Sequence, residues 1–109
     1  MTQRFYHATS LEAAELIQKE GLKPIWDYVY LTDSLDSARR WMGFRFMVMG
    51  VREYAIVEVE MDPTRLRPGT DHSPLMEAIF GTGPSLTYSR RISPKRIRKI
   101  HYERAGFGD

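Results

Sequence analysis

Two short stretches near the start of the chain, residues 4–8 and 28–31, are rich in apolar and aromatic side chains, and each predicts a β-strand. Both are followed by polar residues and then by apolar residues at helical spacing. This spacing predicts one helix over residues 11–20 and a second from residue 35 to about residue 49. Gly21 and Gly50 come next, where glycine commonly ends a helix.

The residues before each predicted helix indicate how its first turn is capped. Thr9 and Glu12 have the Thr-x-x-Glu spacing of a capping box, which predicts Thr9 as the first cap. For the second helix the sequence offers three caps without choosing among them: Thr32, Asp33 and Ser34. Each junction therefore runs from a strand end into a helix N-terminus, where backbone N–H groups lack partners within the helix.

The clearest strand pattern in the second half of the chain covers residues 54–61. One face of this strand is apolar, and the other ends in Glu58 and Glu60, which predicts that this end meets water. The remaining pattern predicts loops over 62–73 and 81–84, strands over 85–92 and 96–102, and either a short helix or a strand over 74–80. We therefore expect a single α+β domain over residues 1–109, with two helices early and most strands late.

Composition narrows the class of protein. A hydrophobic content of 42% and a charged content of 28% are ordinary for a soluble globular protein. No apolar run is long enough to span a bilayer, and the N-terminus lacks the apolar core of a signal peptide, so we expect a cytoplasmic protein without a membrane partner. Cysteine is absent and the three histidines have no ligand spacing, so we expect no disulfide, thiol nucleophile or metal site.

Charge is distributed unevenly along the chain. Residues 90–109 hold seven Lys/Arg and two Asp/Glu, whereas residues 1–89 hold nine Lys/Arg and twelve Asp/Glu. A basic C-terminal segment suits a polyanionic partner or a phosphate-bearing ligand, or forms a solvated basic edge. The residues that we assign to nucleic-acid contact are Arg90, Arg91, Lys95 and Arg96.

His7 and Tyr30 are the strongest candidates for chemistry. Each lies near the end of a predicted strand, just before a helix N-terminus, and adjacent strands can bring an imidazole and a phenol to one cleft. Two plainer interpretations stay open. His7 can satisfy a neighbouring backbone carbonyl group, and Tyr30 can pack on the sheet with its hydroxyl in water.

Three short motifs follow one another in a set order along the chain. They are Tyr6-His7-Ala8-Thr9-Ser10, Val29-Tyr30-Leu31-Thr32-Asp33-Ser34 and Ile92-Ser93-Pro94-Lys95-Arg96-Ile97. In this order they resemble the ADP-ribosyltransferase superfamily, and they are most similar to its small DNA-modifying toxins and to the RNA 2′-phosphotransferases. The resemblance implies a small split β-sandwich that uses NAD as a substrate.

The resemblance also implies a role for particular residues. His7 would hydrogen-bond a ribose hydroxyl of the nicotinamide nucleoside, the backbone of Ala8 would hold the carboxamide, and Tyr30 would stack on the nicotinamide ring. The full set of NAD-binding residues that it implies is His7, Ala8, Thr9, Ser10, Tyr30 and Thr32.

The sequence departs from this family in its catalytic acid. Relatives usually carry a glutamate where a late strand opens, but here that strand opens with Pro84-Ser85-Leu86-Thr87. Glu77, upstream of it, is the acid that we assign to catalysis together with His7 and Tyr30. The RNA 2′-phosphotransferases also lack the glutamate and use arginines around a phosphate, for which this chain offers Arg39, Arg40, Arg90 and Arg91.

Three functions therefore compete. The first is an NAD-dependent transferase that passes ADP-ribose to a macromolecule, either a nucleic acid or a protein, and a 2′-phosphotransferase activity is its close variant. The second is a catalytically degenerate module that binds NAD, ADP-ribose or a phosphate. The third is a basic nucleic-acid-binding domain without a nucleotide pocket.

Overall fold

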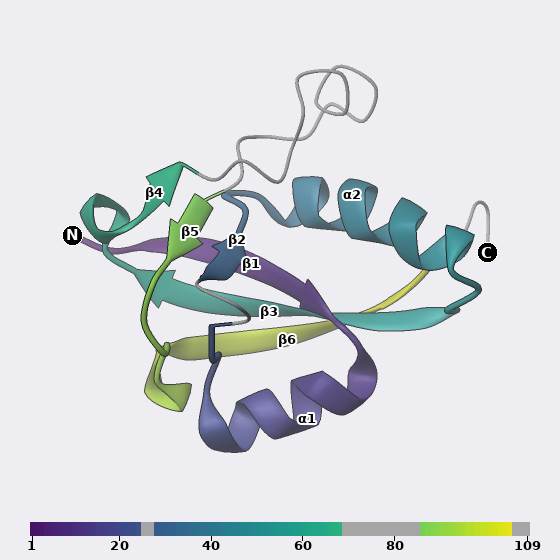
Figure 1. The fold of residues 1–109 in the computed structure, drawn as a ribbon, viewed down its shortest axis with the longest axis horizontal. Coiled ribbons are helices and arrows are strands. Elements are labelled where there is room, and N and C mark those ends of the chain that lie inside the picture. Colours follow the sequence, from purple (N-terminus) through teal and green to yellow (C-terminus); the bar gives the residue numbers. More distant parts are fainter. Residues whose placement is uncertain (25–27, 69–85, 106–109) are drawn as a thin grey trace.

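A computed structural model describes residues 1–24, 28–68 and 86–105 (Figure 1). Its elements, in chain order, are β1 (Gln3–Thr9), α1 (Leu11–Glu20), β2 (Val29–Leu31), α2 (Leu35–Val48), β3 (Glu53–Met61), the 3-10 turn η1 (Pro63–Arg65), β4 (Arg67–Pro68), β5 (Leu86–Tyr88), the 3-10 turn η2 (Pro94–Arg96) and β6 (Ile97–Arg104). The expected α+β class is confirmed.

The strands form two antiparallel sheets. The larger sheet has the order β1-β3-β6, and the smaller has the order β2-β5-β4. In Figure 1, β3 runs through the middle of the molecule, with α1 and α2 on opposite sides of it. The centre of β3 is fully buried on both faces, because Ala55, Ile56 and Val57 have no exposed surface.

The main core lies where the two sheets face each other. Phe5 and Val59 of the larger sheet belong to one buried cluster with Val29 and Leu31 of β2. Apolar burial of this kind contributes roughly 25 cal/mol per Å² of surface removed from water. Helix α1 closes the side of this cluster, and its partly buried Ile17 packs against it.

Helix α2 covers one end of the opposite face of the larger sheet. Ala38 and Phe46 of the helix are buried against Tyr54 and Ile56 of β3. The rings of Phe46 and Tyr54 are stacked with their centroids 5.1 Å apart. The described helices include none that is both long and apolar enough to cross a membrane.

Both predicted helices are present, and one predicted cap is wrong. Helix α1 covers residues 11–20 as expected, but its N-cap is Ser10, whose hydroxyl accepts a hydrogen bond from the Ala13 N–H at 3.1 Å. Because the helix begins at Leu11, Thr9 lies one residue before the cap position; it is the last residue of β1, paired with Ala55. Helix α2 is capped by Ser34, one of the three candidates.

Of the late strands, β6 lies close to the predicted strand over residues 96–102, whereas the segment before it differs from the prediction. Instead of a strand over residues 85–92, β5 has only three residues, and Ile92 makes an isolated bridge to Leu22. The chain bends at Ser89 and Arg90, so one continuous strand does not form. The expected loop over 62–73 contains η1 and β4 in its described part, and residues 74–80 lie outside the described chain.

Candidate functional site

His7 lies near the end of β1, with its side chain on the same face as the buried Phe5. Its Nδ1 atom is 2.8 Å from the backbone carbonyl oxygen of Tyr30. A carbonyl oxygen can only accept a hydrogen bond, so Nδ1 carries the proton and donates it. The neutral ring therefore keeps a lone pair on Nε2, for which the described residues provide no partner.

The surroundings of His7 keep its ring neutral. Burial lowers the pKa of the imidazole below its ordinary value of 6.5, and the hydrogen bond to the Tyr30 carbonyl only partly opposes this. At neutral pH the side chain is thus a positioned hydrogen-bond acceptor rather than a cation. The plainer interpretation, that His7 satisfies a backbone carbonyl, is correct for Nδ1 and leaves Nε2 available.

A hollow of about 160 Å³ adjoins His7. Its wall is formed by Thr9, by one side of α1 and by the residues that follow the helix: Ala13, Leu16, Ile17, Glu20, Gly21, Leu22 and Lys23. Sites that enclose a whole drug-sized ligand are larger, at about 300–1,000 Å³. The volume of this hollow is therefore sufficient for one ring of a ligand, and the remainder of such a ligand would lie outside it.

The strands β1 and β2 separate beside this hollow. Tyr6 and Thr32 exchange two backbone hydrogen bonds of 2.9 Å each. In an antiparallel ladder the next such pair would be Ala8 with Tyr30. The Tyr30 carbonyl is instead bonded to the His7 ring, and no described residue pairs with the Ala8 backbone along this edge. The split thus leaves a donor and an acceptor of the main chain available.

Tyr30 contributes its backbone to this arrangement, while its ring lies elsewhere. Val29 and Leu31 point into the core, so the intervening Tyr30 points to the other face of β2, where it is 39% exposed. Its ring meets that of Tyr28 edge-on, with centroids 6.4 Å apart. The two predicted junctions are neighbours, but the hollow beside His7 is not lined by the Tyr30 ring.

The hydroxyl residues of the two junctions have different roles. Thr9 lines the hollow, whereas the hydroxyl of Ser10 is occupied by capping α1. The Thr32 hydroxyl donates to the backbone carbonyl of Ser34 at 3.0 Å, and so it shapes the turn into α2. Glu77, the predicted catalytic acid, lies outside the described residues.

The predicted basic residues lie next to the hollow. The bridge between Leu22 and Ile92 brings the turn after β5 against the end of α1, where the Arg91 Nε donates to the Glu20 carbonyl at 2.6 Å. This turn and η2, which we together call the basic turn, carry four exposed cations: Arg90, Arg91, Lys95 and Arg96. Arg39 and Arg40 are instead paired with the carboxylates of Glu103 and Asp36.

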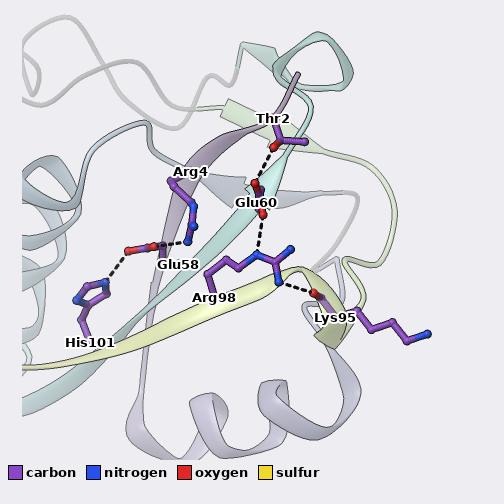
Figure 2. Close-up of polar contacts among 7 residues, drawn as sticks. All are labelled: Thr2, Arg4, Glu58, Glu60, Lys95, Arg98 and His101. Carbon is purple, nitrogen blue, oxygen red and sulfur yellow. Dashed lines mark hydrogen bonds and ion pairs between the residues drawn. The ribbon is translucent and has the colours of Figure 1, made fainter.

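The sequence reasoning missed a row of charged side chains across the larger sheet (Figure 2). Glu58 accepts from Arg4 at 2.7 Å and pairs with His101 Nε2 at 2.9 Å. Glu60 accepts from Thr2 at 2.7 Å and from Arg98 Nε at 2.6 Å. We call these six residues, with the partly buried Tyr6, the polar row.

The polar row joins all three strands of the larger sheet. All four oxygens of its two carboxylates have a donor, so neither acid is available as a base or nucleophile in this arrangement. Burial, followed by the charge of Glu58, raises the pKa of Tyr6, whose ring centroid is 6.3 Å from that of His101. The sequence predicted that the end of β3 with Glu58 and Glu60 is polar. It did not predict the partners of these two glutamates, because the partners depend on which strands flank β3.

Among the described residues, no group of three or more His, Asp or Glu side chains could hold a metal ion. Comparison of the chain with models of protein families gave no match. A comparison with curated proteins also found no significant similarity.

Proposed function

We propose that this protein binds NAD at the split between β1 and β2 and transfers ADP-ribose to a macromolecular acceptor, as the ADP-ribosyltransferases do. The observation that carries this proposal is the hydrogen bond of 2.8 Å between His7 Nδ1 and the Tyr30 carbonyl. That bond orients a neutral ring whose Nε2 can accept a hydrogen bond from a ribose hydroxyl.

The groups around His7 support the same ligand. A primary carboxamide offers one acceptor and two donors, and the backbone of Ala8 offers a donor and an acceptor that no described residue uses. The hollow of about 160 Å³ suits a single ring. Tyr30 has its ring on the far side of β2, so stacking on nicotinamide would require the ligand to reach that face.

The reaction breaks the bond between the ribose anomeric carbon and the nicotinamide nitrogen, which takes the bonding electrons. The acceptor forms a bond to that carbon and loses a proton. Positive charge grows on the sugar, so a nearby carboxylate accelerates the step. Glu77 is our assignment for this carboxylate, and Glu20, which lines the hollow and is paired with Lys23 at 2.9 Å, is the competing one.

Two substitutions of His7 separate ligand binding from folding. In His7→Asn, the amide nitrogen can still donate to the Tyr30 carbonyl, but the acceptor at the Nε2 position is lost. We expect this variant to unfold at a temperature close to that of the wild type and to bind NAD at least about tenfold more weakly by calorimetry. His7→Gln places an amide near the Nε2 position and should retain more affinity.

Release of nicotinamide from NAD, measured with nucleic-acid and protein acceptors, tests turnover. Loss of release in Glu77→Gln but not in Glu20→Gln would support Glu77 as the acid. Saturable binding of NAD without release would indicate a degenerate binding module instead. If the wild type does not bind NAD, or if His7→Asn binds it as tightly as the wild type, the proposal is wrong.

A second function, nucleic-acid binding, is favoured by the position of the basic turn. Its cations are exposed, and Arg91 is fixed against the end of α1 that lines the hollow. Neutralising Arg90 and Arg96 should weaken the binding of an oligonucleotide and make that binding less sensitive to salt. If this change leaves NAD binding intact, the two activities use separate groups.

A further inference from the structure

A second hollow lies where α2 ends and the chain turns through Gly50 into β3. Its volume is about 730 Å³, which lies in the range of about 300–1,000 Å³ that ligand-binding sites occupy. Met47 and Val51 contribute apolar surface to it, and Arg52, Glu53 and Arg104 contribute charge. None of these residues belongs to the His7 hollow or to the polar row.

Within the described residues, the two arginines of this hollow have no carboxylate partner. Arg52 and Arg104 are exposed, and neither side chain has a hydrogen bond or an ion pair with a described residue. On the same sheet, by contrast, Arg4 and Arg98 are each paired with a glutamate. A backbone hydrogen bond of 2.8 Å from the Ala105 N–H to the Arg52 carbonyl holds the two arginine-bearing segments together.

Glu53 does not neutralise this pair. It lies opposite Arg104 in the register of β3 and β6, yet no ion pair joins it to either arginine in the described chain. Because the lining has two guanidinium groups and one carboxylate, the net charge of its side chains is positive. An unpaired guanidinium group presents donors in a planar fork that matches a carboxylate.

Apolar side chains continue the surface beside the hollow. Val48 and Met49, at the end of α2, are 69% and 63% exposed. Methionine and arginine are both enriched in protein–protein interfaces relative to the rest of a surface. Together, exposed aliphatic groups and unpaired arginines suit a ligand that carries both apolar and acidic groups.

We infer that this surface, which comprises Met47, Val48, Met49, Arg52 and Arg104 and which we call the turn surface, docks an acidic amphipathic segment of a partner protein. A nucleic acid fits it less well. Unstacked bases are held on aromatic rings, whereas the apolar members of the turn surface are aliphatic. Aliphatic side chains instead bury the apolar face of a helix or strand.

The test uses the full chain and two synthetic helical peptides. Both peptides carry leucine along one face, and the opposite face carries glutamate in one and lysine in the other. We expect the glutamate peptide to bind saturably by fluorescence anisotropy, with an affinity that falls as salt is added. The lysine peptide should not bind. Replacing Arg52 and Arg104 together by glutamate should lower the affinity by at least about tenfold.

A matched variant controls for net charge. Arg65→Glu with Arg67→Glu makes the same change on η1 and β4, which lie at the opposite end of the molecule in Figure 1, and it should leave binding unchanged. Val48→Ser with Met49→Ser should also weaken binding.

The inference is overturned if the glutamate peptide does not bind, if both charge-reversed variants lose affinity equally, or if an oligonucleotide binds the turn surface more tightly than the peptide. None of these measurements uses NAD, so they leave the proposed function untouched.

Discussion

Gly21 and Ile92 approach each other so closely that no side chain fits between them. A Cβ atom on residue 21 would lie 2.2 Å from the Ile92 carbonyl oxygen, and φ of Gly21 is +82°, where side chains are disfavoured. Hydrogen bonds of 2.9 and 2.8 Å between Leu22 and Ile92 hold the contact. It fixes the basic turn against the end of α1, and so it shapes the wall of the His7 hollow.

Substitution of Gly21 is therefore expected to lower the free energy of unfolding more than substitution of a glycine that has a positive φ angle but no close neighbour. Gly50 has φ of +78°, and a Cβ atom added there would have nothing within 4 Å. We expect Gly50→Ala to lower the free energy of unfolding by about 1 kcal/mol, and Gly21→Ala by about 3 kcal/mol because a backbone clash is added. Urea unfolding of both variants measures the difference, and equal costs would contradict the clash.

Gly43 and Tyr54 should be energetically coupled. A Cβ atom on Gly43, in the middle of α2, would lie 3.1 Å from the Tyr54 hydroxyl oxygen. Alanine normally stabilises a helix interior by about 1 kcal/mol relative to glycine. We expect Gly43→Ala to stabilise by this amount in a Tyr54→Phe background and by less in the wild type. A double-mutant cycle of chemical unfolding checks this, and purely additive effects would contradict it.

The polar row should stabilise the sheet unequally along its length. Glu58 has 15% of its side-chain surface exposed and Glu60 has 27%. We expect Glu58→Ala to lower the free energy of unfolding by about 1–2 kcal/mol, because Arg4 and His101 both lose a partner. Glu60→Ala should cost less, since solvent screens its pair. Denaturant unfolding at low and high salt measures both losses of unfolding free energy. A larger loss for Glu60→Ala than for Glu58→Ala would contradict the prediction.

His7 should make stability depend on pH. Its pKa is lowered in the folded protein, so below its ordinary value of 6.5 the unfolded chain binds a proton that the folded protein does not. The free energy of unfolding should therefore fall as the pH decreases through the ordinary pKa of about 6.5, by up to about 1.4 kcal/mol per pH unit. His7→Asn should remove this component, and an unchanged slope in that variant would show that other groups cause it.

Much of the early fold could be predicted because it depends on neighbours in the sequence. Helix α1 has its predicted bounds, because apolar spacing and a terminal glycine act within a few residues. The cap was assigned one residue too early, since only the pairing of Thr9 with Ala55 shows where β1 ends. The strand β5 was predicted less well than β6, because β5 depends on β2 and β4 and the pattern from 85 to 92 carries no mark of its end.

The site could be predicted in part. The sequence predicted that His7 and Tyr30 lie close together, because each precedes a helix in a similar strand-to-helix junction. The two residues do make contact, but the 2.8 Å distance joins the His7 Nδ1 atom to the backbone carbonyl oxygen of Tyr30 and not to its ring. The direction of the Tyr30 ring was not predictable, because it depends on which face of β2 meets the core. The charged partners of Glu58 and Glu60 could not be identified either, since they come from β1, β6 and the N-terminus.

By itself, then, the sequence determined the α+β class, the two helices, and the alternation that leaves one end of β3 polar. These follow from periodicity and capping, which are properties of adjacent residues. Only the tertiary structure decided that β1 and β2 separate after Tyr6 and Thr32, that Gly21 lies against Ile92, and that Arg52 and Arg104 line one hollow beside α2. Those contacts join residues far apart along the chain, and they form because burying the shared core brings the strands into one order among many.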